Sequence, residues 1–295
     1  MEKRRRFSRL AILLPVFLAL ISGCAGNAYA QIGNDLSTMQ ENILATEDIS
    51  ARLVEICNWQ IEDSKQHWAD YDKAIKNGTT FDRGDSDDKD VEEKYDEPSQ
   101  QIQVLETIAS SFTPATPAGQ DAFDQTAGVY TQYLTDLRLS AADMKTMFDY
   151  YFEMREALKP FEEFAYAEST TGYTDYALMA GQLSQIITQT QKALKDVACP
   201  PFMKSSHDAL VLRIDEMQSF SQDFSIAVQM GDVLRLSSSV YRSERISKLI
   251  DQGDRRLDED FSLQFQQTAD RLTGRAAQMR EELLKNIAVL NAAIA

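Results

Sequence analysis

The sequence predicts an all-α protein, folded as an elongated antiparallel bundle of four to five long helices. Only 12 glycines and 7 prolines occur among 295 residues, which disfavours the many turns of a β-sandwich. Apolar residues recur at spacings of three and four over long stretches, as they do along the buried face of a helix. Alternation with a period of two, the mark of a half-buried strand, is not found at a useful length.

The first long helix is expected after a short tether at residues 24–35. Its apolar positions fall near helical spacing on one face from Leu36 to Ile75. Asn77-Gly78 is expected to end this helix, because glycine readily adopts the left-handed conformation that follows many helices.

An exposed acidic loop is predicted at residues 77–98, because acidic side chains crowd a stretch with few apolar ones. Calcium prefers oxygen ligands, so this loop is a candidate for weak calcium binding. The EF-hand pattern is not met, since Lys89 stands at a ligand position, and the alternative interpretation is a solvated run of charge. The candidate ligands are Asp85, Asp87, Asp88 and Asp90.

Pro98 suits the first turn of a second, modest helix that ends near Phe112. The third helix has the clearest pattern, an apolar stripe from Phe123 to Leu158 with alternating spacings of four and three. Such a stripe predicts left-handed packing against other helices. Pro160 is expected to end or kink this helix.

A fourth helix is expected from about Tyr173 to Val197, and a fifth after Pro200-Pro201. Breaks are expected at Gly231, at Ser237–Ser239 and at Gly253-Asp254. A last helix then follows from about Leu257. We interpret residues 36–295 as a single helical-bundle domain.

The N-terminal segment has the pattern of an export signal. Lys3-Arg4-Arg5-Arg6 precede an apolar run over residues 10–21, and Ser22-Gly23-Cys24 follow. The run is about 12 residues long, whereas a spanning helix needs about 20. The segment resembles a bacterial lipoprotein signal with its lipobox. This resemblance implies removal of residues 1–23, lipidation of Cys24, and an extracytoplasmic protein anchored to a bacterial membrane.

A second cleavage site leaves an alternative open. Ala28-Tyr29-Ala30 is an A-x-A site, and cleavage before Gln31 would release a secreted protein. The paired arginines also resemble a twin-arginine signal loosely, with Ser8 where that family has an apolar residue. Export by the general secretory route and export by the twin-arginine route therefore both stay open.

The charge of the chain excludes one class of partner. The net charge is −16, and removal of residues 1–23, with five basic residues and one acid, brings it to −20. A nucleic-acid binder needs a positive surface to displace counterions from phosphates, so no nucleic-acid partner is expected. Charge-driven binding to anionic lipid headgroups is disfavoured for the same reason. The acidity suits a solvated protein, or one with cationic partners.

The chain contains three cysteines, and Cys24 is lipidated or removed under either cleavage. The remaining pair, Cys57 and Cys199, is expected to form a disulfide in an oxidising compartment. Its loop of about 140 residues would stabilise the fold by roughly 5 kcal/mol in the chain-entropy description. The alternative is two buried thiols.

No catalytic motif was found, so the protein is predicted not to be an enzyme and to need no cofactor. His67 and His207 are the only histidines, and neither a G-x-S-x-G elbow nor an H-E-x-x-H motif occurs. Tyr173 and Tyr176 flank a loop rich in glycine and threonine, where they could line a groove for glycan or peptide. At helical spacing, aromatic residues also commonly belong to a bundle core.

These features favour a membrane-anchored helical scaffold that binds another envelope protein or the cell wall. The first alternative is a helical lipoprotein that binds a small ligand or a metal in association with transport. The second is an enzyme with carboxylate-only chemistry, such as a glycan hydrolase, which requires two inward-facing acids about 5–10 Å apart.

Overall fold

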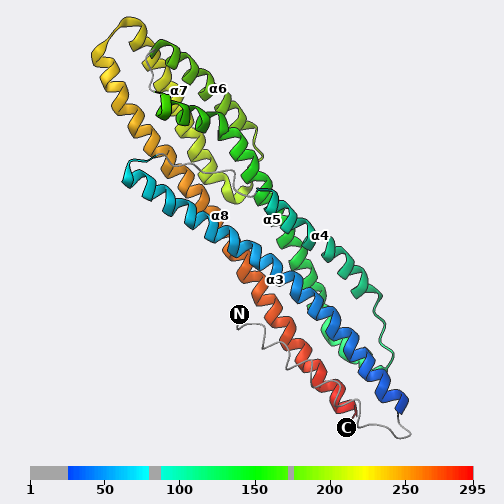
Figure 1. Cartoon of the computed structure of the whole chain (residues 1–295). Coiled ribbons are helices and arrows are strands. Elements are labelled where there is room, and N and C mark those ends of the chain that lie inside the picture. Colours follow the sequence, from blue (N-terminus) through cyan, green and yellow to red (C-terminus); the bar gives the residue numbers. More distant parts are fainter. Residues whose placement is uncertain (1–25, 80–87, 172–175, 295) are drawn as a thin grey trace. The chain divides into compact units, whose positions relative to one another are not determined.

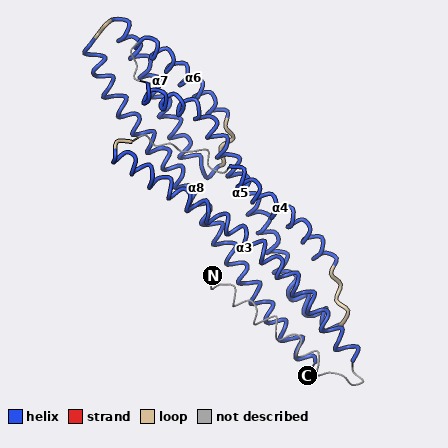
Figure 2. The backbone as a smooth tube through the Cα atoms, in the orientation of Figure 1, coloured by secondary structure: helices blue, strands red, loops and turns tan. Residues whose placement is uncertain are grey.

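The computed structural model describes residues 26–79, 88–171 and 176–294. Every regular element within these ranges is a helix, so the all-α prediction is confirmed (Figure 1; Figure 2). None of the described helices combines the length and apolarity needed to cross a bilayer. The helices are α3 (Gly26–Asn77), α4 (Asp88–Ser111), α5 (Pro117–Thr171), α6 (Tyr176–Asp196), the 3₁₀ helix η2 (Pro201–Met203), α7 (Lys204–Met230) and α8 (Val233–Ile294).

The chain groups into two compact units. Unit 1 takes residues 1–56, 90–141 and 269–295, and unit 2 takes residues 57–89 and 142–268. Helices α3, α5 and α8 therefore contribute to both units. Nearly all of α4 belongs to unit 1, whereas α6 and α7 belong to unit 2. The single domain expected from the sequence stays a prediction.

In unit 1, α3 begins earlier than the sequence predicts. The tether expected at residues 24–35 is instead helical from Gly26 onward. Apolar burial explains the difference, because it outweighs the low helix propensity of Gly26 and Gly33. Four side chains from α3, α5 and α8 form this part of the core, and each is at most 7% exposed. They are Ile32, Leu36, Ala122 and Leu290.

A buried carboxylate joins α3 to the start of α5. Asp35 is 4% exposed. Its Oδ1 accepts a hydrogen bond from the Ala115 N–H at 2.8 Å, and its Oδ2 accepts from the Thr116 N–H and hydroxyl at 3.1 and 2.9 Å. The Thr116 hydroxyl oxygen accepts from the Gly119 N–H at 2.9 Å, which caps the helix. A Cβ on Gly119 would overlap the Asp35 carboxylate, so this contact requires glycine.

Within unit 1, α3 and α5 run parallel, and α8 runs against α5. Helix α4 lies between α3 and α5 in the chain and lets both point the same way, as alternate helices of an antiparallel bundle do. In the contacts between α3 and α5, the residue numbers increase together along the two helices. In the contacts between α5 and α8, the residue numbers increase along one helix as they decrease along the other. The pairs are Asp35–Thr116 and Thr46–Tyr133 for α3 with α5, and Thr126–Asn286 and Asp136–Arg275 for α5 with α8.

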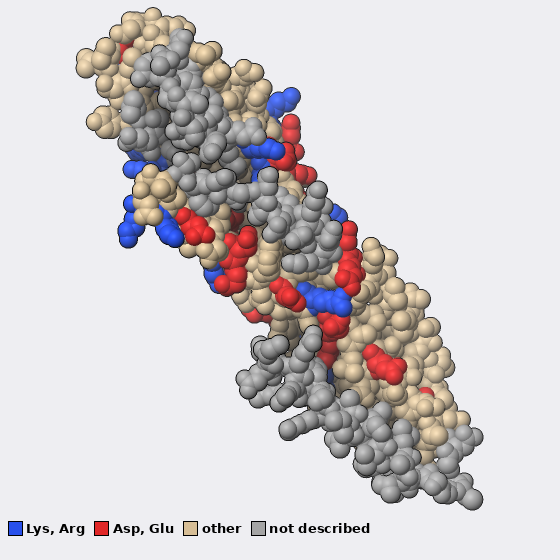
Figure 3. All heavy atoms as spheres, in the orientation of Figure 1, with Lys and Arg blue, Asp and Glu red and all other residues tan. Residues whose placement is uncertain are grey.

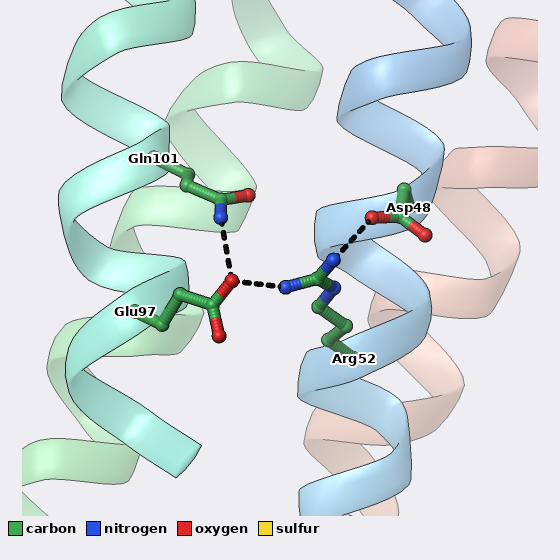
Figure 4. A network of polar contacts seen from close by, with 4 residues as sticks. All are labelled: Asp48, Arg52, Glu97 and Gln101. Atoms are coloured by element: carbon green, nitrogen blue, oxygen red, sulfur yellow. Dashed lines mark hydrogen bonds and ion pairs between the residues drawn. The ribbon is translucent and has the colours of Figure 1, made fainter. Parts of the chain in front are cut away.

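Figure 4 shows the polar link between α3 and α4 in unit 1. Arg52 of α3 lies between Asp48, one turn earlier on the same helix, and Glu97 of α4. Gln101 donates a hydrogen bond to the same Glu97 oxygen at 2.9 Å. These side chains are largely exposed, so the network contributes little to stability and mainly aligns the two helices.

The expected loop at residues 77–98 is shorter in the structure. Asn77 does end α3, and Gly78 has a φ of 65°. Residues 80–87 lie outside the described residues, and α4 already begins at Asp88, which makes Pro98 an interior residue. The acids at the start of α4 suit a helix N-terminus, which favours negative charge. The acidic residues from Asp88 onward, which the sequence predicts as part of a loop, therefore form the start of α4.

The apolar stripe predicted for the third helix faces the core. Positions such as Leu137, Met144 and Phe148 of α5 are buried. Tyr133 and Tyr150, beside that stripe, are also buried, so the packed face is wider than a coiled-coil seam. Pro160 does not end α5, which continues to Thr171.

Unit 2 contains a second helix that is longer than predicted. Helix α8 passes through both Ser237–Ser239 and Gly253, where breaks were expected. Gly253 is buried, and a Cβ built on it would lie 3.5 Å from Cδ1 of Leu210 on α7. This glycine packs against a neighbouring helix and does not end its own.

The capping contact in unit 1 generates the first prediction. Gly119→Ala should lower the free energy of unfolding by about 1–3 kcal/mol, because the new Cβ displaces the buried Asp35 carboxylate from its donors. Urea unfolding followed by circular dichroism measures the change.

Gly128→Ala is the matched control on the same helix. A Cβ added to Gly128 would meet no neighbouring side chain within 4 Å, so alanine should raise stability by about 0.5–1 kcal/mol through helix propensity. Equal effects of the two substitutions would contradict the account of the Asp35 contact.

Candidate functional site

Several predicted site residues lie outside the described residues, namely Cys24, Asp85, Asp87 and Tyr173. Asp88 and Asp90 open α4, and Tyr176 opens α6, but their side chains lie outside the description as well. In the part of the chain that the structure describes, no group of three or more His, Cys, Asp or Glu side chains is arranged to hold a metal ion. The calcium and groove hypotheses for these residues stay predictions.

The disulfide predicted between Cys57 and Cys199 is not formed in the structure. Cys57 Sγ lies 3.9 Å from Sδ of Met144, whereas Cys199 contacts the hydroxyl of Tyr150. Met144 and Tyr150 are six residues apart on α5, which is about 9 Å along the helix axis. The two thiols therefore lie at different levels of unit 2, and a bond would require a much closer approach.

Cys199 belongs to a polar cluster with Tyr150 and His207. The Tyr150 hydroxyl lies 3.0 Å from His207 Nδ1, and both side chains are buried. The Leu194 carbonyl accepts a hydrogen bond from the same imidazole. The Tyr150 hydroxyl and Nδ1 share one hydrogen bond, and burial favours the neutral imidazole by lowering its pKa. The Cys199 thiol also contacts the Pro200 carbonyl oxygen at 3.4 Å.

The electrostatics of this cluster favour structure over catalysis. Burial raises the pKa of the Cys199 thiol, although the hydrogen bond with Tyr150 acts in the opposite direction. Burial likewise lowers the pKa of His207 and raises the pKa of Tyr150. A nucleophilic cysteine needs a lowered pKa and a basic partner, and here Tyr150 stands between thiol and imidazole. The cluster joins α5 to α7 and to the connection after α6.

A second cluster in unit 2 joins α3 to α8. The Trp68 indole N–H donates to Asp258 at 2.8 Å, and Asp258 is 7% exposed. The Arg255 guanidinium lies over the Trp68 ring, 4.7 Å from its centroid. Burial raises the pKa of Asp251, against the hydrogen bond that it accepts from Tyr71. Each of these charged groups has a partner on the facing helix, so the cluster holds α3 and α8 together.

Unit 1 contains an apolar pocket between α3, α4 and α5. Its enclosed volume is about 20 Å³, room for about one water molecule and far below the range for small-molecule sites. Nearly all of its lining is apolar, so it offers little to orient a polar ligand. The lining residues are Met39, Asn42, Ile43, Ala109, Phe112, Phe123, Thr126, Ala127 and Tyr130.

The turn between α7 and α8 in unit 2 presents a different kind of surface. Gly231 has a φ of 62°, and its N–H bonds to the Val228 carbonyl at 3.2 Å, while the Asp232 N–H bonds to the Ala227 carbonyl at 3.1 Å. This is a Schellman motif, which commonly brings an apolar side chain back onto the helix. Here that position is Asp232, whose carboxylate instead caps α8 by accepting from the Arg235 N–H at 3.1 Å.

Large apolar side chains around this turn are exposed. We call Met230, Val233, Leu234 and Tyr241 the tip patch. Their exposed fractions are 67%, 71%, 84% and 76%, higher than those of the other exposed large hydrophobic residues of the described chain. On the face drawn in Figure 3, the described atoms near this turn, yellow in Figure 1, are mostly uncharged. Clustered exposed apolar side chains of this kind mark interaction sites.

Sequence reasoning missed the tip patch. Gly231 was expected to break the chain, but the apolar residues on both sides were not recognised as surface. The signal is present in the spacing of α8, because its buried face runs through Ser239 and Ile246, which leaves Leu234 and Tyr241 on another side.

No protein-family model, curated protein or solved structure matches this chain. The tip patch therefore has to be interpreted from its own chemistry.

The buried His207 generates a pH prediction. Because burial lowers its pKa below the ordinary value of 6.5, the unfolded state binds the proton more readily. Stability from this group is complete above about pH 6.5 and is lost as the pH falls below it, by at most about 1.4 kcal/mol per pH unit. Urea midpoints between about pH 7.5 and about pH 5.5 should show this loss.

His207→Gln is the comparison protein, because glutamine cannot be protonated in this range. Asp251 acts with the opposite sign, since a carboxyl group whose pKa is raised by folding stabilises the fold more at low pH. The difference between the two proteins isolates the histidine. Parallel pH profiles would contradict a buried neutral His207.

Proposed function

We propose that this protein is a membrane-anchored, extracytoplasmic helical scaffold that contacts another component of the cell envelope through the tip patch. The observation that carries the proposal is the exposure of Met230, Val233 and Leu234 at the turn between α7 and α8, and of Tyr241 two helical turns further along α8. A water-exposed cluster of this kind is unfavourable unless a partner covers it. A binding role is also favoured over an enzymatic one, because Tyr150, Cys199 and His207 serve to join helices.

The anchor in this proposal is a lipid on Cys24. It is supported by the resemblance of residues 1–24 to a lipoprotein signal, with cleavage before Gln31 as the alternative. An anchored chain needs no spanning helix.

The proposed scaffold is an elongated antiparallel bundle built on α3, α5 and α8. These helices have 52, 55 and 62 residues and contribute to both units, and a helix of 62 residues is about 90 Å long. In unit 1, α8 runs against α5, which supports an antiparallel arrangement around α8.

The second candidate function is binding of a small apolar ligand. The apolar lining of the pocket at Met39, Phe112 and Phe123 suits such a ligand, which would have to widen the pocket on binding. A rise in melting temperature with one member of a panel of small apolar compounds would support this function. The rise should disappear when Ala127 is replaced by a larger residue, Ala127→Phe, which fills the pocket.

The scaffold proposal predicts a contact at the tip in living cells. A photo-cross-linking amino acid at position 241 should capture one recurrent envelope component, identified by mass spectrometry as protein, glycan or lipid. The same group at position 263 is the control, because Leu263 is also exposed on α8, at 51%, outside the tip patch. Identical background capture at both positions would argue against a tip partner.

The anchor is tested separately by Cys24→Ser. The wild-type chain should fractionate with membranes after a salt wash, and the variant should be released into the soluble fraction, because the lipid is the dominant attachment. Equal release of both proteins would favour the secreted form.

A further inference from the structure

We propose that the tip patch and the adjacent exposed face of α8 bind an anionic lipid surface. The inference deepens the proposed function, on which it rests, by naming the component that the tip contacts. It concerns residues 230–248 of unit 2 alone.

The exposed face of α8 is continuous over its first four turns. Leu234, Tyr241 and Lys248 are spaced by seven residues, and Arg245 lies four after Tyr241, so all four share one side of the helix. All four are exposed. The other side of the helix carries Ser239, Ile246 and Ile250, which are buried in unit 2. Helix α8 therefore begins with one face in the core and a second face that is apolar first and basic afterwards.

The local charge opposes that of the whole chain. Residues 230–248 contain four basic residues, Arg235, Arg242, Arg245 and Lys248, and two acids, Asp232 and Glu244, so this segment carries a charge of +2, although the chain carries a net charge of −16. Arg235 pairs with Asp232, and Arg242 pairs with Asp223 and contacts Ser219. Arg245 and Lys248, on the exposed face, extend the basic character beyond these pairs. The net charge of the whole chain disfavours binding to anionic lipid, but it does not reflect the positive charge of this segment.

The combination of side chains matches a lipid interface. Apolar residues beside basic ones on one helix face are typical of helices that lie at the surface of an anionic membrane. Tyrosine is enriched at that level, because its ring is apolar and its hydroxyl reaches the headgroups. Long basic side chains reach phosphate while their stems cover apolar surface.

The size and exposure of the patch favour lipid over a folded protein partner. Stable protein interfaces bury about 800 Å² on each partner and involve some 20–30 residues a side. The tip patch has four large apolar side chains, and its neighbours Ser237 and Ser238 are small and polar. Side chains exposed by 67–84% are surrounded by solvent on most sides, and a fluid lipid surface can enclose them without a preformed complementary shape.

Vesicle binding of the full mature chain carrying Cys24→Ser tests the inference, because this chain cannot be lipidated. The probes are vesicles of phosphatidylcholine and vesicles in which part of it is replaced by phosphatidylglycerol. The partition coefficient should be roughly tenfold or more higher on the anionic vesicles and should fall with added salt.

Leu234→Asp should abolish binding, and the double variant Arg245→Glu, Lys248→Glu should reduce it about tenfold or more. Leu263→Asp is the control on the same helix and should bind like the parent chain. These positions are exposed, so the variants should keep the far-ultraviolet spectrum and melting temperature of the parent.

Equal binding to both kinds of vesicle, no binding to either, or equal loss in Leu234→Asp and Leu263→Asp would overturn the inference. Recurrent capture of one protein from position 241 in cells, without lipid capture, would also overturn it and would favour a protein partner. Failure here leaves the Cys24 fractionation result standing, so the inference and the anchor can fail separately.

Discussion

The left-handed turn at Gly231 is the constraint on which the exposed surface depends. It reverses the chain within two residues, and Asp232 both completes the end of α7 and caps the start of α8. A polar residue at this position cannot fold an apolar side chain back over the helix end, as such turns commonly do. Met230 and Val233, on either side of the turn, lie in solvent. The tight turn that joins α7 to α8 therefore has exposed apolar side chains on both sides.

Three buried polar side chains, Asp35, Tyr150 and Asp258, join helices to one another. Asp35 connects α3 to the start of α5, Asp258 connects α8 to Trp68, and Tyr150 connects α5 to His207. Each is buried or half-buried and satisfied by a partner on a facing element. Such groups are costly without partners and specify one packing when they have them. None presents an activated nucleophile or base to a cavity.

The fold class could be predicted from the sequence, because spacings of three and four directly report a buried helix face. The stripe of α5 and the end of α3 at Asn77 follow from such local signals. Helix ends that depend on tertiary contacts could not be predicted. Ile32 extends α3 through packing, and Gly253 lies buried inside α8, where it faces Leu210 of α7.

The candidate sites were harder to predict than the fold. Two cysteines and an export signal suggested a disulfide. In the structure Cys57 lies beside Met144 and Cys199 beside Tyr150, at two different heights along α5. The packing of α3 and α6 against α5 sets these heights, and the amino-acid composition does not reveal it. Net charge was also misleading, because an average over 295 residues conceals the basic start of α8. The apolar residues around Gly231 can be recognised in the sequence, but only the structure shows that no other described element covers them.

The most direct test of the central claim is hydroxyl-radical footprinting of the unmodified side chains, with and without vesicles that contain phosphatidylglycerol. The account predicts that the oxidation rates of Met230, Leu234 and Tyr241 fall when anionic vesicles are added, while those of the exposed Leu263 and Leu284 stay constant. Unchanged rates at Met230 and Tyr241, or a uniform fall at all five positions, would contradict a membrane-binding tip.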